Sequence, residues 1–143
     1  HVRAIGKAQI NRVAVALLAI ASVLLHGCSD ETSIGKDVRL EYYDDGFYAI
    51  VCDATDSPLA PRPSGAISTV TSVAPVPNSN LLVARVDAVH YTVTEYFLLD
   101  GCAAPRIFRS LAEANSELAI LGLSALAESD FIRSGVVIRR GAL

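Results

Sequence analysis

The sequence predicts an α+β fold, in which an antiparallel sheet carries a C-terminal helix or helix pair packed on one face. Residues 38–99 fall into short runs rich in β-branched and aromatic side chains, separated by Gly, Pro and Asp. Residues 110–122 instead space their apolar side chains three and four positions apart, as an amphipathic helix does. Strands followed by helices, rather than strands alternating with them, indicate the α+β class.

The first two strands are expected to form a hairpin. Val38–Tyr43 alternates in part between apolar and polar residues, and Phe47–Cys52 is a second run of strand-forming residues. Asp44, Asp45 and Gly46 lie between them, and an Asp-Gly pair is a strong hairpin-turn signal. The two runs are therefore predicted to pair with each other.

A loop, a strand and a second loop are expected next. Residues 53–66 contain three prolines and are predicted to be a loop. Ile67–Val73 consists mostly of Ser, Thr and Val, which predicts a strand, and residues 75–80 form the second loop.

The clearest strand signal covers residues 81–99. Residues 89–94 alternate between apolar and polar side chains, which predicts a half-buried antiparallel strand. Tyr96–Leu99 is apolar on both faces and is expected to be the buried centre of the sheet. Asp87-Ala88 is either a turn between two strands or part of one long strand, and two strands are the favoured interpretation.

A helix is expected to begin after Ser110 and to end at Gly122. Ser110 and Glu113 have the spacing of a capping box, in which each side chain accepts a hydrogen bond from the other residue's backbone. Glycine often ends a helix because it adopts a left-handed conformation without strain. Four side chains would form the buried face: Leu111, Ala114, Leu118 and Leu121.

The C-terminal residues are predicted to form a second short helix and a last strand. Ser124–Arg133 is interpreted as the helix, which stops near Gly135. Val136–Arg140 is rich in β-branched residues and ends in two arginines, which is typical of an edge strand that resists further pairing.

The N-terminal residues have the pattern of an export signal. Residues 13–25 form an uncharged, apolar run of 13 residues, preceded by Arg3, Lys7 and Arg12 and by no acidic residue. As a helix this run would be about 20 Å long, whereas the hydrocarbon core of a bilayer is about 30 Å thick. The run is thus short for a transmembrane span.

The apolar run leads into Leu25-His26-Gly27-Cys28, which resembles the lipobox of bacterial lipoproteins over residues 1–28. The resemblance implies that Cys28 receives a diacylglyceryl group, that the chain is cut after Gly27, and that the new amine is acylated. Ser29 after the cysteine favours the outer membrane over the inner one in this family. The alternatives are an ordinary secretory signal with a coincidental cysteine and an uncleaved anchor.

This interpretation divides the chain into three parts. Residues 1–27 are the signal peptide, residues 28–37 are the lipidated cysteine and a flexible tether, and residues 38–143 are a single envelope domain. Without residues 1–27 the chain keeps 116 residues, with 9 basic and 15 acidic side chains and a net charge of −6. An acidic domain has no electrostatic basis for binding nucleic acid, so membrane contact is expected through the lipid.

Cys52 and Cys102 remain once Cys28 carries lipid, and they are predicted to form a disulfide because exported proteins meet an oxidising compartment. A metal-binding or redox pair is the alternative. Neither cysteine belongs to a Cys-x-x-Cys motif, and His90 is the one histidine left to the exported part. No metal or cofactor is predicted.

Acid/base and aromatic residues give two further site hypotheses. Asp44 and Asp45 are candidates for a glycan-acting acid/base pair, although Asp-Asp-Gly is also ordinary turn sequence. His90 is interpreted as a solvated strand residue, so no catalytic residue is assigned. Four tyrosines could form a binding face, since tyrosine is enriched in interfaces: Tyr42, Tyr43, Tyr48 and Tyr91.

The function predicted from these observations is that of a lipid-anchored, non-enzymatic interaction module with an envelope protein partner, such as an assembly accessory, an inhibitor or an immunity factor. The protein would face the periplasm from the outer membrane. A cell-wall or glycan enzyme and a small-ligand-binding lipoprotein are the alternatives. A further likeness, to small uncharacterised envelope lipoproteins, rests on Tyr96–Asp100 and a helix ending in Leu121-Gly122-Leu123; it implies no activity.

Overall fold

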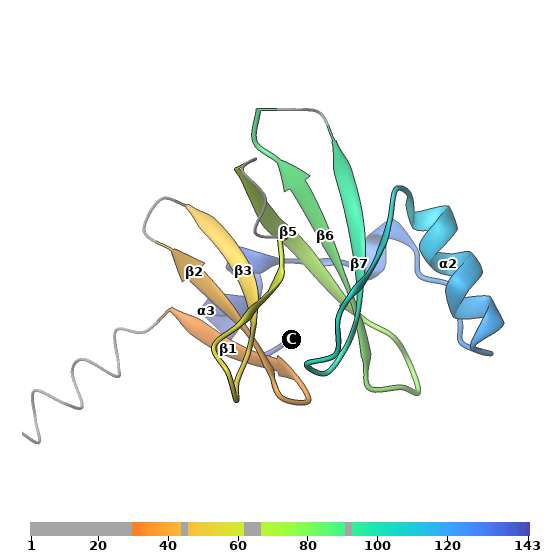
Figure 1. Cartoon of the computed structure of the whole chain (residues 1–143), viewed down its shortest axis with the longest axis horizontal. Coiled ribbons are helices and arrows are strands. Elements are labelled where there is room, and N and C mark those ends of the chain that lie inside the picture. The colour runs from red at the N-terminus through yellow and green to blue at the C-terminus, as the bar shows by residue number, and fades with distance from the viewer. Residues whose placement is uncertain (1–29, 44–45, 62–66, 91–92) are drawn as a thin grey trace, which may run out of the picture.

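In the part of the chain that the structure describes, the strands form two antiparallel sheets, and two α-helices pack beside them (Figure 1). The computed structural model describes residues 30–43, 46–61, 67–90 and 93–143. Most of the regular structure is strand, and the C-terminal helix packs against strands of both sheets. The predicted α+β class is confirmed, with the strands divided between two sheets.

The four-stranded sheet contains the predicted hairpin. β2 and β3 pair in antiparallel register, with Val38 opposite Cys52 and Tyr43 opposite Phe47. A short strand, β4, pairs with β3 inside the segment that was predicted to be a loop. In spatial order the strands are β1 (Glu31–Gly35), β2 (Val38–Tyr43), β3 (Phe47–Cys52) and β4 (Pro58–Ala60).

The prediction of a flexible tether over residues 28–37 is wrong for β1. This strand pairs with β2, and its side chains alternate in burial, with Thr32 and Ile34 facing inward. Ile34 is 5% exposed and belongs to the main core. The sequence did not indicate this strand, because its residues are mostly polar. Its two inward-facing residues alone distinguish it from a segment that is exposed to solvent.

The five-stranded sheet contains the other predicted strands. The predicted strand over residues 67–73 is confirmed as β5, and Tyr96–Leu99 is buried in β7 as expected. β8 and β9 are short and were not predicted. In spatial order the strands are β8 (Arg106–Phe108), β7 (Thr94–Asp100), β6 (Leu81–Ala88), β5 (Ser68–Pro75) and β9 (Ile132–Arg133).

The connection between β6 and β7 lies later than predicted. Asp87 and Ala88 belong to β6, with Asp87 opposite Thr94, so they are not a turn. Val89 is 49% exposed and Val93 is 56% exposed beyond the ends of the two strands. The half-buried strand predicted from Val89 is therefore wrong, because β-branched residues favour an extended backbone but do not ensure that a packing surface is present.

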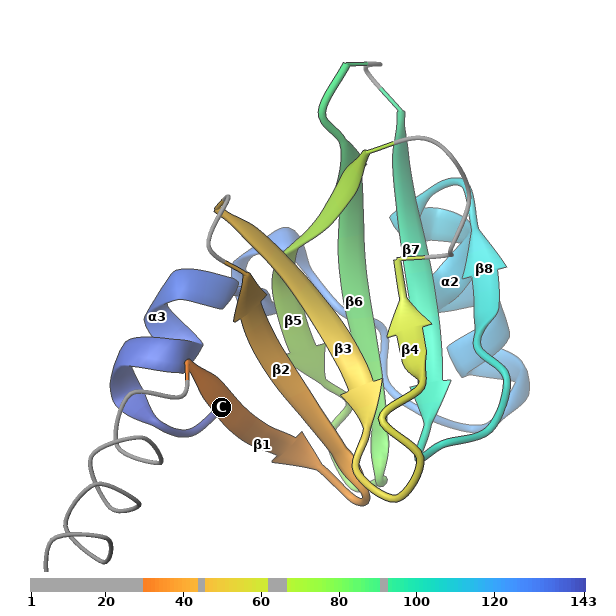
Figure 2. The ribbon, with the colours of Figure 1, turned by 60° about the vertical axis from the view of Figure 1, so that its left-hand side comes forward.

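Two apolar cores lie on opposite faces of the five-stranded sheet. The first fills the space between the two sheets and includes Leu40, Ile50 and Phe97. The second lies under α2 (Leu111–Ile120) and includes Val83, Leu98 and Leu118. Figure 2 shows the resulting layers, with the four-stranded sheet in front and α2 behind the five-stranded sheet.

Helix α2 begins as predicted, although its cap differs in one bond. The Ser110 hydroxyl accepts a hydrogen bond from the Glu113 amide at 3.1 Å. The Glu113 carboxylate accepts from the Arg109 amide at 2.9 Å, one residue before the position a capping box would use. The carboxylate still lies at the helix N-terminus, where negative charge is favourable.

The predicted end of α2 at Gly122 is confirmed, whereas its predicted buried face is correct only in part. Gly122 has a φ of 72°, and the Leu123 amide donates to the Leu118 carbonyl at 2.8 Å, which is a Schellman ending. Ala114 and Leu118 are buried. Leu121 is 46% exposed, because it lies past the last helical turn.

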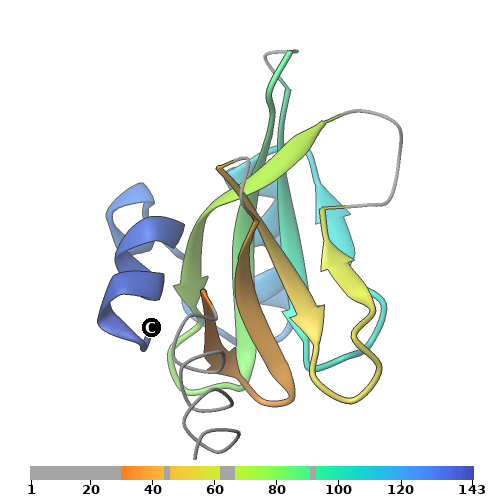
Figure 3. The same ribbon diagram turned by 90° about the vertical axis from the view of Figure 1, so that its left-hand side faces the viewer.

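The prediction for the C-terminal residues is wrong in both elements. Residues 124–133 contain a short 3₁₀ turn (Glu128–Asp130) and β9 in place of a helix, and α3 (Ser134–Arg140) replaces the predicted edge strand. The β-branched residues favour a strand, but helix formation buries Val137 completely and lets the Ser134 hydroxyl donate to the Val70 carbonyl at 2.6 Å. Packing has overridden local propensity here. Figure 3 shows α3 alongside the edges of both sheets.

Candidate functional site

Four of the candidate site residues lie outside the described part of the structure: Cys28, Asp44, Asp45 and Tyr91. The other candidates lie within it, beside side chains that the fold brings next to them.

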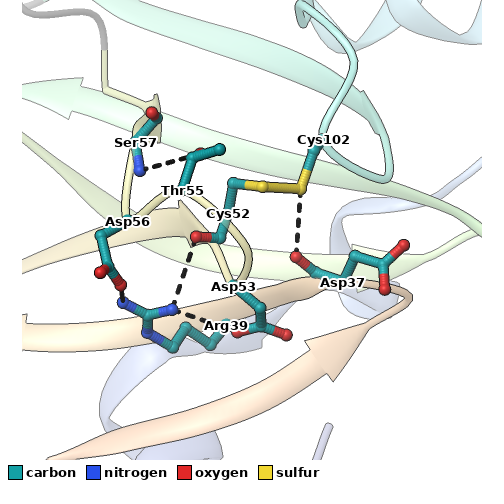
Figure 4. The surroundings of a disulfide bond; sticks show 8 residues. All are labelled: Asp37, Arg39, Cys52, Asp53, Thr55, Asp56, Ser57 and Cys102. Atoms are coloured by element: carbon teal, nitrogen blue, oxygen red, sulfur yellow. Dashed lines mark hydrogen bonds and ion pairs between the residues drawn. A yellow bond between two sulfur atoms is a disulfide. The ribbon is translucent and has the colours of Figure 1, made fainter.

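The predicted disulfide is present between Cys52 and Cys102 (Figure 4). Cys52 is the last residue of β3, and Cys102 follows the end of β7, with 5.4 Å between their Cα atoms. The bond consequently ties the four-stranded sheet to the five-stranded sheet. This position gives it a structural role.

Arg39 organises an ion-pair cluster next to the disulfide (Figure 4). Its guanidinium donates to Asp56 at 2.5 Å, to Glu41 at 2.8 Å and to Asp53 at 3.2 Å, and Glu31 lies 3.3 Å away. The hydrogen bonds to Asp56 and Glu41 raise the pKa of Arg39. The cluster holds the turn after β3 against β2. The positive charge of Arg39 is paired with acidic side chains and is not available to a ligand.

The described tyrosines of the predicted binding face separate into two groups. Tyr42 lies opposite Tyr48, and their ring centroids are 5.1 Å apart in a tilted, half-buried pair. Tyr43 is 47% exposed on the other face of the sheet, where its hydroxyl donates to Glu41 at 2.9 Å. Burial and this hydrogen bond raise the pKa of Tyr43. The sequence did not reveal this division, although alternation along β2 requires it.

Among the described residues of the predicted site, Tyr48 alone lines a cleft that has a volume of about 520 Å³. The walls come from the start of β3, from β5 and β6, and from α3 with the residue before it. The lining residues are Gly46, Tyr48, Thr69, Thr71, Ser72, Arg85, Asp87, Arg133, Gly135, Val136 and Arg139. Sequence reasoning missed this cleft because it assigned Arg133 to a helix and Arg139 to an edge strand.

Asp87 is the carboxylate of the cleft, and its hydrogen bonds hold it ionised. It accepts from Thr94 at 2.6 Å and from Thr71 at 2.9 Å, and it lies 3.3 Å from the Arg85 guanidinium. Burial alone would raise the pKa of Asp87, but the bonds from Thr94 and Thr71 and the charge of Arg85 outweigh burial and lower it. A carboxylate with this pKa does not carry a proton near neutral pH.

The three arginines of the cleft differ in their partners. Arg85 forms ion pairs with Asp87 through Nε and with Glu128 through Nη1, at 3.3 and 3.7 Å. Arg133 and Arg139 are exposed, and the described residues place no acidic side chain within ion-pair distance of either. Within the described residues, two arginines without an ion-pair partner therefore border the cleft.

No family model, curated protein or solved structure matches the chain.

His90 and the acidic residues offer no second centre within the described ranges. His90 is exposed in the bend after β6 and does not line the cleft. Among the residues whose positions are described, no group of three His, Cys, Asp or Glu side chains is arranged to hold a metal ion. In the same part of the chain, no helix is both long enough and apolar enough to span a bilayer.

Proposed function

We propose that the protein is a lipid-anchored lipoprotein of the bacterial envelope, whose domain binds a protein partner without catalysing a reaction. Three observations support this proposal. The lipobox-like sequence at Leu25–Cys28 supports the anchor, the disulfide suits an oxidising compartment, and an acidic domain suits an exported protein that does not bind nucleic acid. On the same basis we place it at the outer membrane, facing the periplasm.

The state of Asp87 carries the non-enzymatic part of the proposal. A general acid or base works best with a pKa near the operating pH and with an unhindered path to the substrate. Asp87 has a lowered pKa, and its oxygens are occupied by Thr71, Thr94 and Arg85. The groups left open in the cleft are cationic or hydroxylic, and these suit recognition better than proton transfer.

The outer face of the four-stranded sheet is the surface that we propose for the partner. Tyr43 is the most exposed described tyrosine, and it lies directly opposite Phe47, which is partly exposed. Aromatic side chains of this kind carry much of the binding energy in protein interfaces. The Arg39 cluster on the same face supplies a polar rim with a rigid geometry.

Replacing Cys28 with serine is expected to leave the protein unlipidated and to release it from the membrane fraction, or to leave residues 1–27 attached. The thiolate is the nucleophile that takes the lipid, and a hydroxyl cannot replace it. Mass spectrometry of membrane-purified wild-type protein should find an acylated N-terminal Cys28. An unmodified Cys28 behind an intact residue 1 would overturn the anchor.

Replacing Tyr43 with alanine is expected to weaken partner capture in envelope cross-linking by a factor of about 30 or more, which corresponds to 2 kcal/mol at a hot spot. Tyr43→Phe is the matched control, because it keeps the ring and removes the hydroxyl, so it should bind nearly as well as wild type. Asp45→Ala and His90→Ala should leave capture and phenotype intact. A phenotype lost in either of these two variants, while the fold and the partner complex persist, would favour the enzyme alternative instead.

A further inference from the structure

We propose that the cleft between α3 and the two sheets is a binding site for a phosphate monoester, with Arg133 and Arg139 holding the phosphate group. This inference goes beyond the proposed function, because it needs neither the lipid anchor nor the partner surface at Tyr43. It follows from the charge, the donors and the size of the cleft.

The charge of the cleft matches a dianion. Asp87 pairs with Arg85 inside the cleft, whereas Arg133 and Arg139 have no acidic neighbour within ion-pair distance among the described residues. Three arginines and one carboxylate line the cleft, so its described lining has a net charge of +2, in a chain whose acids outnumber its basic residues by 15 to 12. A phosphate monoester carries a charge of about −1.5 to −2 near pH 7, while a carboxylate carries only −1.

The geometry of the donors suits phosphate oxygens. A guanidinium presents its N–H groups as a planar fork, which binds phosphate through two parallel hydrogen bonds. The Tyr48 hydroxyl adds a neutral donor to the same cleft, and no described residue accepts a hydrogen bond from it. Glycine at position 135 leaves room for this hydroxyl, because a Cβ atom there would lie 3.0 Å from the hydroxyl oxygen.

The size of the cleft indicates an organic group in addition to the phosphate. Its volume of about 520 Å³ lies within the range of 300–1,000 Å³ that is typical of small-ligand sites, and it is much larger than one phosphate ion. The Tyr48 side chain and Val136 provide apolar surface near the arginines. The expected ligand is therefore a small phosphorylated compound or the phosphate headgroup of a lipid.

Calorimetric titration of the full chain with phenyl phosphate tests the proposal. Saturable binding is expected, and each of Arg133→Gln and Arg139→Gln should weaken it about tenfold or more, because each removes a charged hydrogen-bond donor from the phosphate. Arg140→Gln is the matched control: it removes an exposed arginine of the same helix that does not line the cleft, and it should bind like wild type. Benzoate, which has the same ring and a single charge, should bind more weakly than phenyl phosphate.

A vesicle arm separates the two sources of phosphate. Cys28→Ser protein is mixed with phosphatidylcholine vesicles, with and without phosphatidic acid, in forms with and without the two glutamine substitutions. One outcome is that phosphatidic acid increases vesicle binding of the protein with both arginines but not of the doubly substituted form. If phenyl phosphate does not bind in the same experiments, the site is assigned to a lipid headgroup. The proposal is overturned if neither probe shows binding that depends on Arg133 and Arg139, or if benzoate binds as tightly as phenyl phosphate. Neither result would bear on Tyr43 or on the lipidation of Cys28.

Discussion

Replacing both Cys52 and Cys102 with alanine should lower the free energy of unfolding by about 4 kcal/mol. The bond closes a loop with a sequence separation of 50, and the chain-entropy model gives about this loss when the unfolded chain is freed from such a loop. A typical domain is stable by only 5–15 kcal/mol, so the effect is large. Because the bond connects the two sheets, its loss should also weaken their docking.

Urea melts of the full chain, with and without a reductant, measure this effect. The wild type under reducing conditions should behave like the double-alanine variant, which should itself be insensitive to reductant. Cys28→Ala removes the third cysteine and keeps the disulfide, so it should melt like the wild type. A loss below about 1 kcal/mol in the double variant would show that packing alone holds the sheets together.

The second large effect is expected at Leu118, the buried leucine of α2. Its side chain is 0% exposed and packs in the second core with Val83 and Leu98. Leu118→Ala removes most of this side chain and leaves a cavity, which costs about 2–5 kcal/mol in comparable cores. The change should appear as a lower midpoint of unfolding without a large change in the slope of the transition.

Ile120→Ala provides the comparison for Leu118→Ala. Ile120 belongs to the same helix and loses a side chain of the same size, but it is 78% exposed. Its replacement should change stability by no more than about 0.5 kcal/mol, as most surface substitutions do. Equal losses in the two variants would mean that α2 does not pack on the sheet through Leu118.

The elements that were predicted correctly are those whose signals are local. The β2–β3 hairpin depends on two adjacent runs and the short turn between them. The ends of α2 depend on Ser110 and Gly122, which act on backbone groups within one turn of the helix. The pairing of Cys52 with Cys102 followed from setting Cys28 apart as the lipid-bearing residue, which left one pair.

The errors occurred where distant residues decided the outcome. Val136–Ile138 favours a strand in isolation, yet it is helical because Val137 enters the core between the sheets and Ser134 bonds to Val70, 64 positions away. β1 is a strand because β2 lies beside it, and the local sequence around Ile34 does not show this. A short segment with two inward residues gains its stability from its neighbour rather than from its own composition.

The α+β class, the hairpin and the limits of α2 could be predicted from the sequence, because they depend on backbone propensities and on residues close in the chain. The cysteine pair, 50 positions apart, could be predicted by elimination. Only the folded arrangement shows that Tyr43 is exposed while Tyr48 lines a cleft, and that Arg133 and Arg139 border the same space. The cleft joins β3, β5, β6 and α3, which are far apart in sequence, so its charge could not be deduced from any one segment. Such a site exists only after the packing of the cores has set the relative positions of its walls.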